Sequence, residues 1–323
     1  MRPFRLIAAC VAAAAIAFAV PVANAQEKHQ VRVAMLGPSS LLWLHAIAKD
    51  QGFYDAHDIE VQELVASTSP ALLQAVSSGS VEAGISVADL AMRAIDQNAP
   101  IIISGAVLGK SILRFVGGKG VETAADIDGR PVTAGGVQGG TANLLRYLMN
   151  EQGVDGTGAQ LVAMANSRDR IVALQNGQVA GSLLIAPFDS MAQRDGMKVL
   201  GDYTEDYLQT PLILNTSWAE ANREAAVGIT QATRDAANWI YDPANKEKAI
   251  DILAAFTNVD RELCAESYAF IVEEQKAIGV GLEVTPASLE NLLKISDAVG
   301  ASRESDQTFD ISRYYDPSYL AGN

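Results

Sequence analysis

Two similar segments, which lie far apart in the chain, decide the fold: Ala75-Val76-Ser77-Ser78-Gly79-Ser80-Val81-Glu82-Ala83-Gly84 and Ala173-Leu174-Gln175-Asn176-Gly177-Gln178-Val179-Ala180-Gly181-Ser182. Each ends an apolar helical pattern, stops it with a glycine and then begins a buried strand. Glycine accepts the left-handed backbone that ends many helices at little steric cost. The repetition predicts two matching βαβ lobes that face each other. Such lobes would place helix N-termini on both sides of one cleft, an arrangement that holds a ligand without any catalytic residue.

Strands and helices alternate along both halves of the chain, which predicts an α/β fold with largely parallel sheets. The first half has expected strands at 31–36, 59–64, 83–87 and 101–107 and expected helices at 41–51, 71–78 and 88–97. The second half has expected strands at 132–134, 160–164, 181–185, 199–200 and 212–214 and expected helices at 142–152, 170–175 and 187–194. The C-terminal part is helical in pattern, at 217–241, 246–255, 261–272 and 288–298, and residues 309–320 read as a tail packed back on the body.

The chain is expected to leave the first lobe near residues 110–118 and to return near residues 208–216. Two crossings make a two-strand hinge. We therefore expect one lobe from residues 26–114 and 213–323, and a second lobe from residues 115–212.

The N-terminus has the pattern of a signal peptide. Arg2 and Arg5 precede an uncharged, alanine-rich run, and Ala23-Asn24-Ala25 is an A-x-A cleavage site, so we expect residues 1–25 to be removed after Ala25 on export. A membrane anchor is the alternative, but Pro21 and the cleavage site argue against it. Cys10 lies in a lipoprotein-like box, although almost no hydrophobic core would precede it.

Composition excludes several classes of protein. The formal net charge is −14 and no run of Lys or Arg is present, so nucleic-acid binding is not expected. The acidic balance also means that an anionic ligand would have to be held by local groups. After cleavage only Cys264 remains, which allows no internal disulfide. Cys264 lies in a helical pattern and is expected to be a small buried residue and not a nucleophile.

Candidate ligand-binding residues come from predicted helix starts that follow strands, because ligands of open α/β sheets bind beyond the carboxyl ends of the strands. A helix N-terminus offers unpaired N–H donors and a partial positive charge. The four starts are Ser39-Ser40, Thr68-Ser69, Gly139-Gly140-Thr141 and Asn166-Ser167. The alternative is that these polar side chains only cap their helices.

Three further groups lie near these starts. Trp43 is placed either to stack on a ligand or to pack against the sheet. Arg168 is a candidate partner for a carboxylate or sulfonate, with Asp169 or solvent as the alternative. Pro187-Phe188 follows a strand of the second lobe and is a candidate apolar wall.

Signals for catalysis, metal binding and cofactor binding are absent from the sequence. There is no G-x-S-x-G or H-E-x-x-H motif, and His29, His45 and His57 are poorly spaced for a metal site. The glycine-rich loop at 135–141 lacks the lysine of a P-loop. We therefore expect a protein that is not an enzyme, with no cofactor and no metal.

Several phrases together resemble a known family. Ile47-Ala48-Lys49-Asp50-Gln51-Gly52-Phe53-Tyr54 is similar to the first helix end of nitrate/sulfonate/taurine-type substrate-binding proteins of ABC transporters, which also resemble thiamine-pyrimidine synthase. Further similar phrases, in the same order, are Val31-Arg32-Val33-Ala34, Ile59-Glu60-Val61, the 75–84 segment, residues 126–132, Leu184-Ile185-Ala186-Pro187-Phe188, Ser217-Trp218-Ala219 and Asp242-Pro243-Ala244-Asn245. The phrase Val116-Gly117-Gly118-Lys119 departs from the family, where a charged phrase is common, and this puts hinge details in doubt.

The resemblance implies a type II periplasmic-binding-protein fold, a hinged monomer that closes on a small molecule in the periplasm. Its implied partners are an ABC permease and the ATPase that drives it. By position, the family's ligand loops correspond to Ser39, Ser40, Leu41, Thr68, Ser69, Val87, Ala88, Gly139, Gly140, Thr141, Ala186 and Pro187, beside which we place Trp43, Ser167 and Arg168. The apolar Leu41-Leu42-Trp43 start favours an organic acid or an aromatic ligand over nitrate.

Two other functions are compatible with this family shape. The thiamine-pyrimidine synthase consumes its own histidine and relies on a cysteine-rich segment, whereas the chain after Ala25 has one cysteine. A periplasmic sensor that passes its ligand to a receptor is the second alternative, and the sequence does not separate it from transport.

Overall fold

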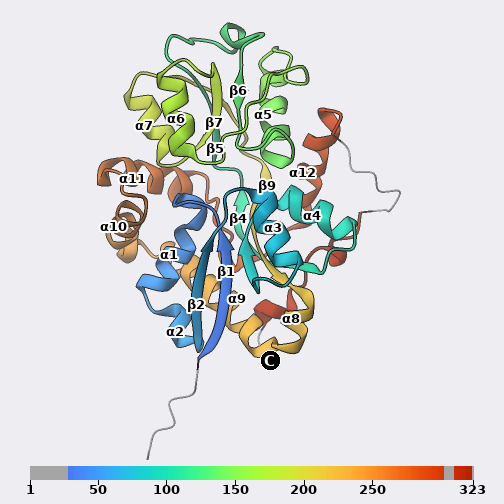
Figure 1. The fold of residues 1–323 in the computed structure, drawn as a ribbon. Helices are drawn as coiled ribbons and strands as arrows, with labels where there is room; N and C mark the ends of the chain where they lie inside the picture. The colour runs from blue at the N-terminus through green and yellow to red at the C-terminus, as the bar shows by residue number, and fades with distance from the viewer. Residues whose placement is uncertain (1–27, 302–308, 322–323) are drawn as a thin grey trace, which may run out of the picture.

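The computed structural model describes residues 28–301 and 309–321. The chain forms two lobes, each built on its own sheet, and the C-terminal helices lie alongside both (Figure 1). The predicted signal peptide, residues 1–25, lies outside the described residues. Over the part of the chain that is described, none of the helices combines the length and the apolar character that a membrane crossing requires.

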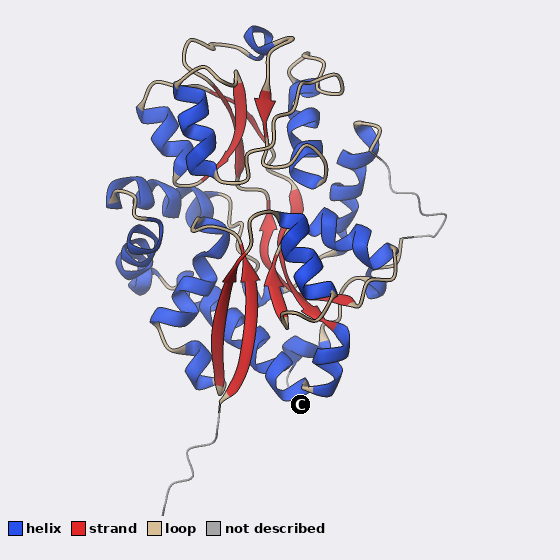
Figure 2. Ribbon diagram, viewed as in Figure 1, coloured by secondary structure: helices blue, strands red, loops and turns tan. Residues whose placement is uncertain are grey.

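The first lobe is built on a five-stranded sheet with the order β2-β1-β3-β9-β4. The strands are β1 (His29–Met35), β2 (Ile59–Val65), β3 (Ala83–Ile85), β4 (Ile101–Lys110) and β9 (Asp206–Asn215). Helices α1 (Trp43–Asp50), α2 (Phe53–Ala56) and α9 (Arg223–Ile240) pack on one face, and α3 (Ser69–Ser77) and α4 (Ala88–Asp96) pack on the other (Figure 2).

The second lobe is built on a four-stranded sheet with the order β6-β7-β5-β8. Its strands are β5 (Leu113–Gly117), β6 (Val132–Thr133), β7 (Gly181–Ile185) and β8 (Val199–Asp202), and its helices are α5 (Gly140–Glu151), α6 (Ser167–Gln175) and α7 (Phe188–Arg194). The sheets are largely parallel in direction, as predicted: β1, β2, β3 and β4 run the same way in the first sheet, and β6, β7 and β8 run the same way in the second. Parallel pairing occurs within the βαβ units, but β5 and β9 run antiparallel to their neighbours because they carry the chain from one lobe to the other.

Two connections cross between the lobes, as the sequence predicts. Residues 111–112 join β4 to β5, and residues 203–205 join β8 to β9. The first crossing is tied to β9, because the Ile112 amide donates to the Gln209 side-chain oxygen at 2.8 Å. The lobe boundaries differ from the predicted ones: Leu113 and Arg114 already pair in the second sheet, and residues 206–212 pair in the first.

The C-terminal helices contact both lobes. They are α10 (Lys246–Thr257), α11 (Arg261–Tyr268) and α12 (Pro286–Ala298). Helix α12 packs on α5 of the second lobe and on β9 of the first, while α11 packs on α7. The C-terminal helices therefore join the two lobes in addition to the two crossing segments. The remaining short elements are α8 (Thr216–Ala221), α13 (Ser318–Ala321), a π-helical turn at Ala269–Glu274, and 3-10 turns at Ser40–Leu42, Ala124–Ile127, Pro243–Asn245, Val280–Leu282 and Ile311–Arg313.

Three predicted elements differ in detail. The helix expected at 217–241 is divided at Asn222 into α8 and α9, and the one expected at 261–272 ends in the π-helical turn. Residues 160–164 make a single bridge from Leu161 to Val132, because most of this segment is exposed and has no core face to bury. The tail does pack back on the body, where Tyr315 pairs with Ile103.

A polar cluster in the first lobe predicts a loss of stability in acid. The His45 ring, which is buried, lies 3.2 Å from Glu63, and the Lys49 ammonium lies 2.6 Å from the same carboxylate. The bonds from His45 and then Lys49 lower the pKa of Glu63 from 4.5 to about 2. A carboxyl group whose pKa is lower in the folded state than in the unfolded state stabilises the fold when the pH is above the unfolded-state pKa. This contribution is lost as the pH falls through the folded-state pKa. We expect the free energy of unfolding to drop between pH 4.5 and 2, with a shallower drop in Glu63→Gln. Identical pH profiles in urea titrations would contradict the assignment.

Candidate ligand-binding site

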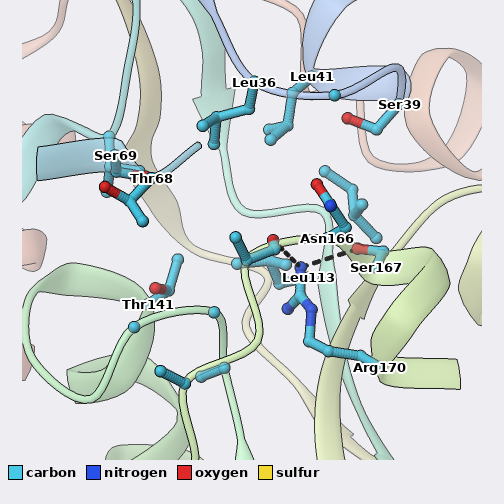
Figure 3. A pocket seen from close by; sticks show the side chains of 18 of the residues that line it. Leu36, Ser39, Leu41, Thr68, Ser69, Leu113, Thr141, Asn166, Ser167 and Arg170 are labelled. Atoms are coloured by element: carbon cyan, nitrogen blue, oxygen red, sulfur yellow. Dashed lines mark hydrogen bonds between the residues drawn. The ribbon is translucent and has the colours of Figure 1, made fainter. Parts of the chain in front are cut away.

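A cavity of about 650 Å³ lies between the lobes (Figure 3). This volume is in the range of small-molecule sites. The first lobe contributes the loop after β1 and the starts of α3 and α4, and the second lobe contributes the glycine-rich loop before α5 and the start of α6. The predicted convergence of helix starts on one interlobe cleft is therefore present in the structure.

The predicted ligand-binding residues divide into two groups. Those that line the cavity are Ser39, Leu41, Thr68, Ser69, Val87, Gly140, Thr141, Ser167 and Arg168. Those outside its lining are Ser40, Trp43, Ala88, Gly139, Ala186 and Pro187.

Trp43 belongs to the core and not to the cleft wall. Its indole N–H donates to the Ala249 carbonyl at 3.0 Å, and the ring meets Tyr268 edge-on. Of the two alternatives, stacking on a ligand or packing in the core, the structure shows packing, although against the C-terminal helices α10 and α11 and not against the sheet. Ser40 and Ala186 instead join the lobes, because the Ser40 hydroxyl donates to the Ala186 carbonyl at 2.6 Å.

The four helix starts are not equally available to a ligand. The Thr68 hydroxyl already accepts a bond from the Ala71 amide at 3.2 Å, which is a normal helix cap. Ser39 and Asn166 make no such cap bond to their own helices. The first turn of α5 is packed against the buried Asp89 carboxylate, so this helix end already faces a negative charge.

Arg170 is a charged residue of the cavity wall that our sequence interpretation missed. It lies one turn into α6, lines the cavity, and is 7% exposed (Figure 3). Its guanidinium donates to the carbonyls of Leu183 at 2.5 Å and Ala165 at 3.4 Å, and to the Ser167 hydroxyl at 2.8 Å. The available signal was its place on the buried stripe of α6, where a charged residue is unusual.

The charge of Arg170 has no bonded counter-ion among the described residues. All its acceptors are neutral, and its buried Nε–H has no partner within residues 28–301 and 309–321. Burial lowers the pKa of Arg170 from 12.5 to about 10, so the side chain stays protonated at neutral pH. A buried cation is costly unless an anion pairs with it, and this one faces a cavity.

Apolar side chains form much of the remaining wall. From the first lobe and the hinge these are Leu36, Leu41, Val87, Leu90 and Leu113, and from the second lobe Ile185 and Phe188. Hydroxyl groups of Ser39, Ser69, Thr141 and Thr210 are spaced between them. The cavity therefore combines one buried cation with a largely apolar surface.

A family model described as NMT1/THI5-like matches residues 45–246. The chain belongs to the NMT1/THI5-like family. This confirms the resemblance to substrate-binding proteins and thiamine-pyrimidine synthase that the sequence phrases carry. No curated protein sequence matches the chain significantly.

Solved structures of several proteins share the fold. A ligand-binding component of an ABC-type import system from Staphylococcus aureus, with zinc bound, has a TM-score of 0.76 at 15% identity, covering 91% of this chain and 98% of that chain. The alkanesulfonate-binding protein SsuA from Xanthomonas axonopodis pv. citri, bound to MOPS, has a TM-score of 0.69 at 16% identity, covering 86% and 94%. The desulfurization enzyme DSZB has a TM-score of 0.64 at 13% identity, covering 91% and 98%. These likenesses confirm the predicted periplasmic-binding-protein fold.

In this family member, Arg168 lines the cavity and also links the two lobes. Its guanidinium donates to the Thr257 carbonyl at 2.9 Å and lies 5.4 Å from the Phe188 ring centroid. Thr257 is the last residue of α10, where carbonyls lack helical partners and a cation is favourable. The sequence suggested Asp169 or solvent as alternatives to a ligand for Arg168, and the structure adds another partner, the end of a helix on the other lobe.

Arg168→Gln should therefore weaken ligand binding modestly, by less than about tenfold, since an exposed link of this kind contributes about 1 kcal/mol or less. The change should appear as faster ligand dissociation, because the link joins the two sides of the cavity around a bound ligand. Stopped-flow or surface-plasmon measurements would separate the two rates. A loss of a hundredfold or more would instead place the charge of the ligand on Arg168.

Neither a metal site nor a reactive thiol is evident in the described ranges. No group of three or more His, Cys, Asp or Glu side chains suited to a metal occurs among residues 28–301 and 309–321. Cys264 is buried, as expected, and burial raises the pKa of its thiol to about 11.

Proposed function

We propose that this protein is the solute-binding component of an ABC import system and that it binds a small organic anion between its lobes. The observation that carries the proposal is Arg170, a buried guanidinium that faces the interlobe cavity without a bonded carboxylate among the described residues. An anionic group of a ligand supplies the missing counter-ion. The closed lobes then present the loaded protein to a permease and its ATPase.

The walls of the cavity support a ligand with an apolar body. Leu36 and Leu41 lie on the first-lobe side of the cavity, Leu113 lies on the opposite side near Arg170, and the volume exceeds what an inorganic anion fills (Figure 3). We infer a sulfonate or carboxylate that carries an aryl or alkyl group. Nitrate would leave most of this apolar surface without contact.

We infer binding without turnover. Among the described residues that line the cavity there is no His, Cys, Lys or Glu, and the one carboxylate there, Asp169, accepts a bond from the Asn166 side-chain amide at 3.3 Å. The Ser and Thr hydroxyls of the wall therefore make no hydrogen bond to a base among the described residues. The thiamine-pyrimidine-synthase-like alternative requires a reactive histidine and cysteines that this lining does not provide.

The cellular setting is part of the proposal. We propose export to the periplasm with cleavage after Ala25, and function as a monomer whose lobes open and close on the hinge. A sensor that hands its ligand to a receptor would use the same cavity. Finding genes for a permease and an ATPase beside the gene of this protein would separate transport from sensing.

A thermal-shift screen of the chain from Gln26 onward tests the binding function. The panel contains alkyl and aryl sulfonates, aromatic carboxylates, nitrate, bicarbonate and thiamine-pyrimidine precursors. A ligand at one hundred times its dissociation constant should stabilise the protein by about 2.7 kcal/mol, and mass spectrometry should recover it unchanged. Conversion of the ligand would show an enzyme, and a flat response to every organic anion would contradict the proposal.

A further inference from the structure

We propose that Asp89 makes the cleft selective for ligands with a single anionic group, an inference that rests on the proposed function. Asp89 is a fully buried carboxylate in the first turn of α4. Its neighbours in the chain, Val87 and Leu90, line the cavity. The role of Asp89 is to keep one end of the cavity free of positive charge.

Asp89 packs directly against the start of α5 on the opposite lobe. A β-carbon placed on Gly140 would lie 2.7 Å from the Asp89 β-carbon and 3.6 Å from its carboxyl carbon. A β-carbon placed on Gly139 would lie 3.7 Å from the Asp89 Oδ2 atom. Because Gly140 and Thr141 line the cavity, the carboxylate lies immediately behind this part of the wall.

The start of α5 would otherwise attract an anion. Helix α5 has 12 residues, and the N-terminus of such a helix presents free N–H groups and a partial positive charge. Asp89 supplies a negative charge at this point. Arg93 pairs with Asp89 at 2.9 Å, and the Ser296 hydroxyl donates to the other carboxylate oxygen at 3.4 Å. Among the described residues that line the cavity, the cations are Arg168 and Arg170, and both belong to α6, so no cation lines the end that α5 forms.

The two ends of the cavity therefore differ in charge. Figure 3 shows Arg170 and Ser167 on one side of the cavity and Thr141, Thr68 and Ser69 on the other. An anionic group bound at Arg170 gains a buried partner. A second anionic group at the far end would be buried near Asp89, where no cation among the described residues lines the cavity, and both burial and like-charge contact are costly.

Matched pairs of ligands test this selectivity. The pairs are benzenesulfonate with benzene-1,4-disulfonate, benzoate with terephthalate, and octanoate with suberate, measured by titration calorimetry at fixed ionic strength. In the wild-type protein the monoanion of a binding pair should bind at least 100-fold more tightly than its dianion. In Asp89→Asn the affinity for the monoanion should stay within about threefold of the wild-type value. The ratio of monoanion affinity to dianion affinity should fall at least tenfold, because α5 and Arg93 are then free to attract the second charge.

Two further variants test the same inference if Asp89→Asn folds poorly. Arg93→Gln leaves the Asp89 carboxylate without its cation and should increase the ratio of monoanion affinity to dianion affinity. Ser296→Ala removes only a hydroxyl and should leave this ratio unchanged. Equal affinity of the wild-type protein for both members of a pair would overturn the inference, as would an unchanged ratio in both Asp89→Asn and Arg93→Gln. Failure of every monoanion and dianion to bind would overturn the proposed function itself.

Discussion

Arg170→Gln should lower the affinity for the organic anion by about 100-fold or more. Removing one partner of a buried, hydrogen-bonded charge pair costs about 2–5 kcal/mol, and each 1.4 kcal/mol is a factor of ten. Most of the loss should appear as faster dissociation, because the charge acts after the ligand has entered the cleft. Titration calorimetry gives the affinity, and circular dichroism shows whether the variant remains folded.

The matched control is Arg130→Gln. Arg130 lies on the same lobe, is exposed, and donates to the Asp126 carbonyl, but it does not line the cavity. The two variants change the net charge equally, so a general electrostatic effect would weaken binding to the same degree in both. Unchanged affinity in Arg170→Gln would show that the anion binds elsewhere.

Gly140→Ala should destabilise the protein and weaken binding together. The added carbon would lie 2.7 Å from the Asp89 β-carbon and 3.2 Å from the Tyr207 hydroxyl, so α5 has to move away from the first lobe. Overpacking of this kind costs about 1–3 kcal/mol, and the better helix propensity of alanine returns up to about 1 kcal/mol. Because Thr141 moves with α5, we expect about a tenfold loss of affinity beside the lower melting temperature.

Gly201→Ala provides the comparison for that experiment. A β-carbon on Gly201 would meet its nearest neighbour, the Gln152 side-chain nitrogen, at an ordinary 3.6 Å. We expect ligand affinity to be unaffected and the melting temperature to change little. If Gly140→Ala behaved in the same way, the close approach of α5 to α4 would not be required for closure.

The lobes, the hinge and the cleft follow from local patterns. Each of these signals depends only on neighbouring residues in the sequence: the glycine after each helix of the repeat, the alternation of strands and helices, and the threonine cap at Thr68. The resemblance to binding proteins adds the order of the two lobes. The lobe boundaries and the directions of β5 and β9 are harder to predict from the sequence, because they depend on how the chain crosses between the lobes.

The charged residues of the site depend on tertiary contacts and were not predictable in the same way. Arg168 and Arg170 lie two residues apart on α6, yet one bonds a helix end on the other lobe and the other is buried beneath the cavity. The place of Trp43 after Ser39-Ser40 is compatible with stacking on a ligand and with core packing, and only the tertiary contact of its indole with α10 decides between them. In the sequence, Asp89 is one acidic residue in the first turn of a helix, which is common. Its contact with Gly140 cannot be predicted from the sequence because it joins segments from opposite lobes.

A crystal structure of the protein with an anion identified in the thermal-shift screen tests the central claim most directly. The account predicts closed lobes, with the anionic group within hydrogen-bond distance of the Arg170 Nε–H and the apolar body against Leu36, Leu41 and Leu113. An anionic group bound away from Arg170, or a ligand outside the interlobe cavity, would contradict it.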